Sequence, residues 1–569
     1  MRKYCVILPL MLASMAQGAN WDALVDRFFD QAYFHFNPSA GTSAGFHQYD
    51  AQLEDLSRAS IEKQAGVLRQ YEREVRDFPG SRLTPGQGAD RELVLGAIRS
   101  ALLDLESIRG WETNPDRYSS TASNAVFVIM SRKFAPPEER LKSVIARERQ
   151  MPKMFAAARV NLKNPPRIYT EIAIGQLPDI VSFFQHDVPL AFAAVGDRAL
   201  LGRFHESNAT VIRELRSYET FLRNDLLPRS KGDFRIGAEN FRKKLLYDEM
   251  VDIPLDRLLR IGYANLRQDQ AFFRATAKKI DPAKTPRQIL DEAEKDHPAA
   301  DQLLDAFRNT LGRLRDYIIQ HGIVTIPSPV LPVLEETPPF MRALTTASMD
   351  TPGPYEKVAK EAFFNVTLPE KNWTPAHIED HLEMFNRGVI ASTSIHETYP
   401  GHYVQFLWVQ SAPSKVRKLL GANSNAEGWA HYCEQMMIDE GYGGGDLKLR
   451  LGQLQDALLR DARYIVGIGM HTGTMTFDQG VDFFVKEGMQ TPGTAVVETK
   501  RGTSDPTYLY YTLGKLEILK LRADYRKMRG ASYSLREFHD NFLKQGFPPI
   551  EIVRREMLRE APGKASPVL

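Results

Sequence analysis

The sequence of 569 residues exceeds what one compact core of ordinary size can hold, so several subdomains or one large body must share the burial of apolar surface. Its 43% hydrophobic and 25% charged residues fall in the globular range, and no interior stretch is apolar for long enough to cross a bilayer. A formal charge of +2 gives no bulk electrostatic reason to bind nucleic acid or anionic lipid, so any partner must be recognised by a local site.

The first residues predict a secretory signal. Met1-Arg2-Lys3 is basic, an apolar run continues through Met15, and Ala16-Gln17-Gly18 has the character of a cleavage site. A membrane anchor is the alternative, but the run is too short to span a bilayer and no stop-transfer flank follows it. We therefore expect cleavage after Gly18 and a periplasmic or secreted mature protein with no stable membrane insertion.

Cysteine is scarce in this sequence. Cys5 lies too early for a lipoprotein cleavage site and leaves with the signal, so Cys433 alone remains. No intramolecular disulfide can then form, and packing must stabilise the protein in an oxidising compartment. We interpret the Cys433 thiol as a small buried apolar group rather than as a nucleophile.

The chain from Trp21 to about Gln320 predicts a series of long amphipathic helices. Apolar residues recur at three- and four-residue spacing, and Pro/Gly clusters such as Phe78-Pro79-Gly80 and Asn164-Pro165-Pro166 interrupt them. The segment from Val324 to Pro339 is instead rich in proline and β-branched residues. Together with the short apolar run at 362–368, it predicts a few strands or extended segments.

Helical periodicity returns after Thr374-Pro375, a predicted helix start, and persists to about Leu558 with Gly441 to Gly445 as its clearest break. The predicted fold class is mainly α, one large multi-helix body with a minor β element. Its expected parts are the signal peptide at 1–18, an N-terminal helical region at 19–320, a mixed extended or β segment at 321–374 and a C-terminal helical region at 375–569.

The C-terminal region carries a histidine motif, His-Glu-Thr-Tyr-Pro-Gly-His, at 396–402. In the ordinary zinc signature, histidines at i and i+4 share one helix face and the glutamate between them acts on water. Here the second histidine stands at i+6, about 240° around a regular helix, so the two rings would point apart. Pro400 lacks an N–H and Gly401 tolerates unusual dihedrals, so we expect the helix to open there. The alternative is a kinked helix with two unrelated histidines.

A second motif supplies a carboxylate, Glu427, 25 residues after His402. Two histidines and a downstream glutamate leave a fourth position open for water, as catalytic zinc sites require. We therefore predict one zinc ion per chain, held by His396, His402 and Glu427, with Glu397 as general base. The alternative for Glu427 is an acid that a helix N-terminus favours.

His431 and Glu434 follow Glu427 by one and two turns of the same predicted helix, so they can share its face. We expect them to orient a metal ligand by hydrogen bonding. His431 is also a rival ligand, although the His-His-Glu set is already complete without it.

The two motifs resemble the bacterial family called domain of unknown function 885 (DUF885), whose marks are His-Glu-x-x-Pro-Gly-His followed by Glu-Gly-Trp. The similarity covers nearly the whole mature chain. It includes the region of Gly45 and Asp55, Phe364-Asn365 and Tyr511-Thr512-Leu513-Gly514. The resemblance implies a helical zinc-dependent hydrolase akin to metallopeptidases, with a glutamate as third ligand and the motif helices below a long cleft that admits short or unfolded peptides.

The resemblance also carries over Arg463, Gly469, His471 and Tyr511. His471 and Tyr511 are suitable donors to the oxyanion that forms when activated water attacks an amide carbonyl, so we predict catalytic roles for both. The alternative is that His471 packs at a helix end and that Tyr511 belongs to an aromatic stripe in the core.

Two departures from the family pattern bear on substrate preference rather than on metal binding. Gly467 stands where an Asp is common, and no Gln precedes Tyr511. Arg463 and Arg501 could clamp the terminal carboxylate of a peptide, which would favour exopeptidase action. Structural or solvated ion pairs are the alternative for both arginines.

The expected function is zinc-dependent hydrolysis of short peptides, in which the metal lowers the pKa of water and Glu397 moves its proton to the leaving amine. One alternative keeps this chemistry for a non-peptide amide or ester, such as an N-acyl compound. Another is a non-catalytic periplasmic protein that binds peptides or metal. Glu397 argues against it, because a structural metal site needs no such acid and usually closes its fourth position with a protein ligand.

Overall fold

The computed structural model describes every residue except 1–19, 339–341, 343–344, 371–372 and 560–568. Helices make up 71% of it and strands 3%, which confirms the predicted mainly α class with a minor β element. The predicted signal peptide lies outside the described residues. Within those residues, no helix combines the length and the apolar character needed to cross a membrane.

The N-terminal part is a chain of helices whose breaks contain the expected proline and glycine. After the break at Phe78-Pro79-Gly80, Thr84 caps the next helix. Its side chain accepts a hydrogen bond from the backbone N–H of Gln87, and the Gln87 side chain accepts one from the backbone N–H of Thr84. In chain order the helices are α1 (Trp21–Phe28), α2 (Phe34–Phe36), α3 (Pro38–Ala44), α4 (Arg58–Arg76), α5 (Pro85–Leu103), α6 (Gly110–Thr113), α7 (Asp116–Met130), α8 (Pro137–Glu148), α9 (Met151–Asn161), α10 (Arg167–Ser182), α11 (Val188–Ala191), α12 (Arg198–Phe221) and α13 (Leu227–Arg229).

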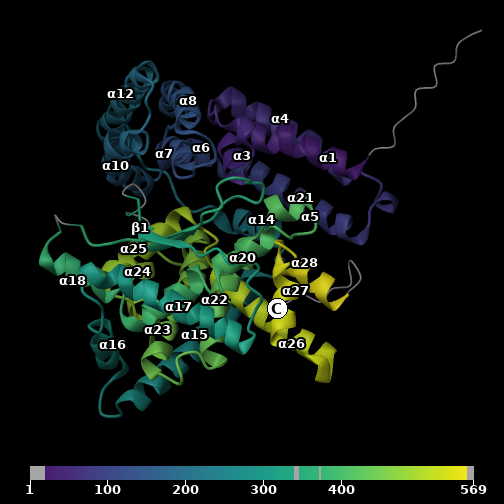
Figure 1. Ribbon diagram of the computed structural model, residues 1–569, viewed down its shortest axis with the longest axis vertical. Coiled ribbons are helices and arrows are strands. Elements are labelled where there is room, and N and C mark those ends of the chain that lie inside the picture. The colour runs from purple at the N-terminus through teal and green to yellow at the C-terminus, as the bar shows by residue number, and fades with distance from the viewer. Residues whose placement is uncertain (1–19, 339–341, 343–344, 371–372, 560–568) are drawn as a thin grey trace, which may run out of the picture.

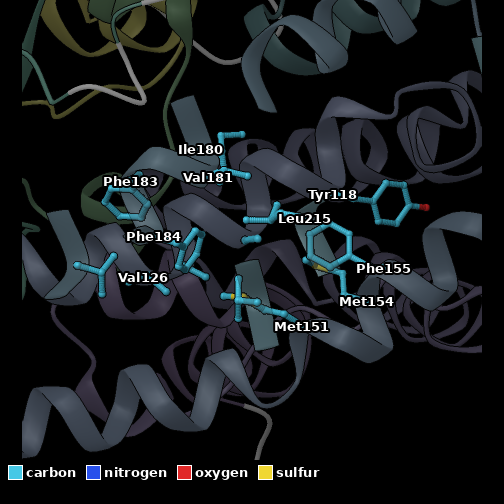
Figure 2. Packing of buried hydrophobic residues seen from close by; sticks show 14 of the residues in the cluster. Tyr118, Val126, Met151, Met154, Phe155, Ile180, Val181, Phe183, Phe184 and Leu215 are labelled. Carbon is cyan, nitrogen blue, oxygen red and sulfur yellow. The ribbon is translucent and has the colours of Figure 1, made fainter. Parts of the chain in front are cut away.

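Two apolar cores hold these helices. One lies among α7 to α12, where Tyr118, Phe155 and Leu215 are buried, as Figure 2 shows. The other surrounds α1, α4 and α5 and also contains Val416 and Ile552 from the C-terminal part of the chain. The N-terminal helices therefore share a core with the region that carries the motifs.

The middle of the chain forms longer helices and a small sheet. These elements are α14 (Gly237–Glu249), α15 (Leu255–Ile280), α16 (Pro286–Glu294), α17 (Leu303–His321), β1 (Val333–Glu336), β2 (Ala347–Asp350) and β3 (Phe363–Val366). The central strand β3 is parallel to β1 and antiparallel to β2. Phe364 of β3 packs against Phe307 of α17, so the sheet is anchored to the helical body.

Helices resume at the predicted start, where Thr374 caps the next helix. They are α18 (Pro375–Glu383), α19 (Arg387–Glu397), α20 (His402–Val409), α21 (Lys415–Leu419), α22 (Asn423–Asp439), α23 (Leu447–His471), α24 (Phe477–Lys486), α25 (Pro492–Ser504), α26 (Tyr510–Arg529), α27 (Leu535–Leu543) and α28 (Ile550–Leu558). The glycine-rich break at 441–445 separates α22 from α23, as expected. Figure 1 shows α15, α17, α22, α23 and α26 grouped together, away from α7 to α12.

Candidate metal centre

The helix opens between the two motif histidines. α19 ends at Glu397, the Tyr399–Pro400 peptide bond is cis, and α20 begins at His402. A Cβ atom on Gly401 would overlap the carbonyl oxygen of His396, so only glycine fits this turn. The ring centroids of His396 and His402 thereby lie 4.8 Å apart, and the two ring planes are nearly perpendicular at 86°.

The Glu-Gly-Trp motif brings the third residue to this pair. Glu427 lies on α22, and a Cβ atom on the next residue, Gly428, would stand 2.5 Å from the Cα of Gly514 on α26. The two helices therefore cross at a pair of glycines. The buried indole of Trp429 donates to the carbonyl oxygen of Pro400 at 3.0 Å, which ties α22 to the histidine turn.

The ligand atoms of the two histidines and Glu427 converge. Oε2 of Glu427 lies 3.3 Å from Nε2 of His396 and 3.3 Å from Nε2 of His402, and all three atoms fall within 4.8 Å of one another. Ligands of a tetrahedral zinc ion, at 2.0–2.2 Å from the metal, lie about 3.3–3.5 Å apart. This Glu427 oxygen is also buried without a hydrogen-bond donor of normal geometry. These three residues therefore form a candidate metal cluster, whose geometry fits a divalent cation.

Charge at the centre favours an ionised carboxylate. Burial alone would raise the pKa of Glu427, but the imidazoles of His402 and His396 hold it well below its usual range. Glu427 therefore offers a carboxylate, the form that binds a metal.

Glu434 orients the ring of His396 through a hydrogen bond at Nδ1. Its Oε1 lies 2.6 Å from Nδ1 of His396, and because a carboxylate only accepts, Nδ1 carries the proton. Nε2 faces Glu427 and is the nitrogen that offers its lone pair to a metal once it is deprotonated, as expected of a metal-binding imidazole. Burial lowers the pKa of His396, but the carboxylates of Glu427 and Glu434 outweigh it and raise the pKa to about 9, so a binding metal ion must displace a proton from this ring.

Two more groups fix Glu434. His431 Nδ1 donates to Oε2 at 2.9 Å, and Arg460 of α23 approaches Oε1 at 3.1 Å. Burial and the Lys515 cation lower the pKa of His431 to about 3, so its imidazole is neutral. His431 thus supports Glu434, and the group of described residues that could hold a metal ion consists of His396, His402 and Glu427 without it.

Glu397 is the last residue of α19 and is half-buried. Among the described residues none pairs with its carboxylate, in contrast to Glu427 and Glu434. A carboxylate directly after His396, with no partner among the described residues, is free to act on a substrate or on water.

Tyr511 lies beside the cluster. Its ring is 6.3 Å from the ring of His396, and its hydroxyl accepts from Arg501 at 3.1 Å. Burial and the nearby Glu427 raise the pKa of Tyr511, so it keeps its proton at neutral pH. Its catalytic role stays a prediction, and its position next to His396 is compatible with that role.

His471 lies apart from the metal cluster. Nε2 donates to the carbonyl oxygen of Gly502 at 2.7 Å, and Nδ1 accepts from Ile236 N–H at 3.4 Å. Burial lowers the pKa of His471 to about 4. Both ring nitrogens are therefore occupied by backbone groups, and these contacts do not favour the predicted oxyanion role. The imidazole instead supports the end of α25.

Arg463 forms a buried ion pair. Its Nε and Nη2 donate to the two oxygens of Glu498 at 2.6 and 2.8 Å. Arg463 thus forms the structural ion pair that was the alternative to binding a peptide carboxylate. Arg501 is more exposed and makes a different set of contacts.

Sequence reasoning missed Arg460 and Glu498 as parts of this site. α23 is buried almost continuously from Ala457 to His471, and Arg460 and Arg463 stand three residues apart within that stretch. Two arginines in an apolar helix need buried acidic partners. That pattern was the available signal, although it does not say which acids they meet.

The long cleft implied by the resemblance stays a prediction. One cavity of about 580 Å³ lies among α1, α5 and α21, and another of about 410 Å³ lies beside the end of α17. Neither is lined by a residue of the metal cluster.

The fold and the site define a class, namely large helical proteins with a buried His-His-Glu group able to hold a divalent cation. A family model described as "Bacterial protein of unknown function (DUF885)" matches residues 38–557, and the chain belongs to this family. A search of curated proteins finds no match.

Two solved structures share the whole architecture. A "putative lipoprotein of unknown function" from Shewanella oneidensis is 26% identical, with a TM-score of 0.78 over 95% of this chain and 100% of that one. A "putative lipoprotein" from Colwellia psychrerythraea is 17% identical, with a TM-score of 0.80 over 94% of this chain and 98% of that one. The second likeness concerns the fold alone.

Proposed function

We propose that the protein is a zinc-dependent hydrolase, a metallopeptidase that cleaves short peptides. The observation that carries the proposal is the convergence of two imidazole nitrogens and one buried carboxylate oxygen, together with an unpaired carboxylate on Glu397, the residue that follows His396 in the sequence. Three protein ligands and a neighbouring acid are the set that catalytic zinc sites use, because the fourth position stays open.

The residues divide the chemistry between them. A zinc ion bound by His396, His402 and Glu427 would supply Lewis-acid activation of water. Glu397 accepts the proton of that water at its carboxylate and delivers it to the leaving nitrogen. Tyr511, held protonated, donates its hydroxyl hydrogen bond to the oxygen that gains charge.

The proposal includes a site of action outside the cytoplasm. The basic and apolar start of the sequence at 1–18 supports it, as do structural relatives described as lipoproteins. N-terminal sequencing of the exported protein is expected to begin at Ala19, whereas a cytoplasmic protein that starts at Met1 would contradict this part.

Exchange of Glu397 for Gln tests the peptidase function. Glu397→Gln keeps the size of the side chain and removes the base, so we expect bound zinc to be retained and kcat/KM on a mixed short-peptide library to fall about 10²- to 10⁴-fold. Glu239→Gln is the matched control, because Glu239 is 81% exposed and forms an ion pair with Lys243 on the same helix. Wild-type turnover in Glu397→Gln would disprove the assigned role. A wild type that holds zinc and cuts N-acyl compounds but no peptide would move the function to non-peptide substrates.

A further inference from the structure

Three arginines surround the ring of Tyr511. The guanidinium carbons of Arg460, Arg463 and Arg501 lie 5.7, 5.0 and 5.8 Å from the ring centroid. They come from α23 and α25, and the ring between them stands next to His396. A concentration of positive charge therefore adjoins the metal cluster.

Two of the three arginines are neutralised by buried acids. Arg460 pairs with Glu434 at 3.1 Å and Asp456 at 3.6 Å, and Arg463 forms two hydrogen bonds to Glu498. Their side chains are only 11% and 8% exposed. The charges of both guanidinium groups are therefore already balanced by buried carboxylates.

Arg501 differs from both. Its side chain is 35% exposed, and it donates a hydrogen bond to a neutral group, the hydroxyl of Tyr511. The nearest acid, Asp505, lies 3.7 Å away, beyond hydrogen-bonding distance, and accepts instead from Tyr510 at 2.8 Å. A guanidinium has five donors and always carries its charge, so Arg501 retains donors for an external anion.

The backbone at Arg501 is held in place, and a hydrogen bond to Tyr511 restrains its guanidinium. Its neighbour in the chain, Gly502, is held by His471, and a Cβ atom on Gly502 would overlap the hydroxyl of Tyr508. The end of α25 is thus packed tightly against α23. A guanidinium held in place binds a carboxylate at lower entropic cost than a mobile one.

We infer that Arg501 binds the free C-terminal carboxylate of the peptide substrate, which makes the protein a carboxyl-end exopeptidase. The inference rests on the proposed function and names its substrate class. Arg501 and His396 both lie beside the ring of Tyr511, with the guanidinium carbon 5.8 Å and the imidazole centroid 6.3 Å from its centroid. A carboxylate bound at Arg501 would therefore lie within a few residues of the metal cluster, at about 3.4 Å per extended residue. A guanidinium fork matches a carboxylate with two parallel hydrogen bonds.

The test uses one short peptide with a free C-terminal carboxylate and the same peptide with a C-terminal amide. Zinc-loaded wild type is expected to cleave the acid with kcat/KM at least about 10-fold above the amide. Arg501→Gln should lower kcat/KM for the acid by about 10- to 100-fold, mainly through KM, and lower it much less for the amide, because the lost hydrogen bond to Tyr511 affects both peptides. Arg501→Lys should regain part of the loss because it restores the charge without the fork. Arg260→Gln, at an exposed arginine paired with Asp256, should match wild type.

Binding separates this inference from the proposed function. The zinc-loaded Glu397→Gln protein should bind the acid more tightly than the amide, and the Glu397→Gln/Arg501→Gln protein should lose that preference. Equal binding of both peptides by Glu397→Gln overturns the inference and leaves peptide hydrolysis standing. An equal loss of kcat/KM on both peptides in Arg501→Gln, at an unchanged melting temperature, also overturns the inference and leaves peptide hydrolysis standing. If wild type cleaves neither peptide, the peptidase function fails and the inference fails with it.

Discussion

At the scale of single residues, Glu434 connects the metal cluster to the interior. One of its oxygens faces His396 and Arg460, and the other accepts from His431. The arrangement fixes the tautomer of His396 without adding a ligand. Burial opposes ionisation of Glu434, but Arg460 and His431 hold its pKa far below the usual range, so the carboxylate stays charged.

Glu434→Gln is therefore expected to weaken zinc binding by about 10- to 100-fold and not to abolish it, because the three ligands remain. Competition with a chromophoric chelator measures the affinity. Asp439→Asn, on the exposed side of the same helix, is the control. An affinity equal to wild type in Glu434→Gln would mean that His396 needs no support from this carboxylate.

At the scale of helices, the centre depends on close crossings at glycine. Gly428 and Gly514 let α22 approach α26, and Gly388 and Gly452 do the same for α19 and α23. Each glycine pair positions a helix that carries a residue of the metal cluster, because α22 carries Glu427 and α19 carries His396. The local geometry of the metal cluster is thus set by backbone contact between helices.

Gly428→Ala is expected to destabilise the fold by about 1–3 kcal/mol and to weaken zinc binding, because the added methyl pushes α22 from α26. Gly66→Ala is the control, since a Cβ atom there meets nothing within 4 Å and alanine favours the helix by about 0.5–1 kcal/mol. Denaturant unfolding of the two variants should shift in opposite directions. A stability gain in Gly428→Ala would contradict the close crossing.

Local chemistry explains what the sequence could and could not predict among these elements. The break at Pro400-Gly401, the start at Pro375 and the break before α23 each follow from proline or glycine, so they were predictable. Strand β2 was missed because Ala-Ser-Met-Asp lacks β-branched and aromatic residues and pairs only through β3. The contact of Arg460 with Glu434 joins two helices by tertiary packing, which no spacing within one helix reveals.

At the scale of the whole molecule, the N-terminal helices are joined to the segment that connects β2 and β3. His47 lies between Asp50, at 3.1 Å, and Glu356, at 3.0 Å, and stacks on Phe134. The hydrogen bond to Asp50 raises the pKa of His47 against the effect of burial, with Glu356 adding to the rise. The protonated imidazole thus joins two acids that are far apart in the sequence.

A raised pKa in the folded state gives a defined pH dependence. The stabilisation by His47 is fully present below its unfolded pKa of about 6.5 and is lost as pH rises through the higher folded value. His47→Gln should therefore lower the melting temperature more at pH 5.5 than at pH 8.5. His205→Gln, at an exposed histidine of α12, should show no such trend. A difference between wild type and His47→Gln that is constant with pH would exclude this role.

The most direct measurement is the zinc content of the purified mature protein after removal of metal and reconstitution, for wild type and Glu427→Gln. We predict one zinc ion per chain in wild type, and its loss from the variant at a chelator concentration that wild type withstands, because Glu427 supplies one of three converging ligand atoms. No bound zinc in wild type, or equal zinc in both proteins, would contradict the metal centre on which the proposed function depends.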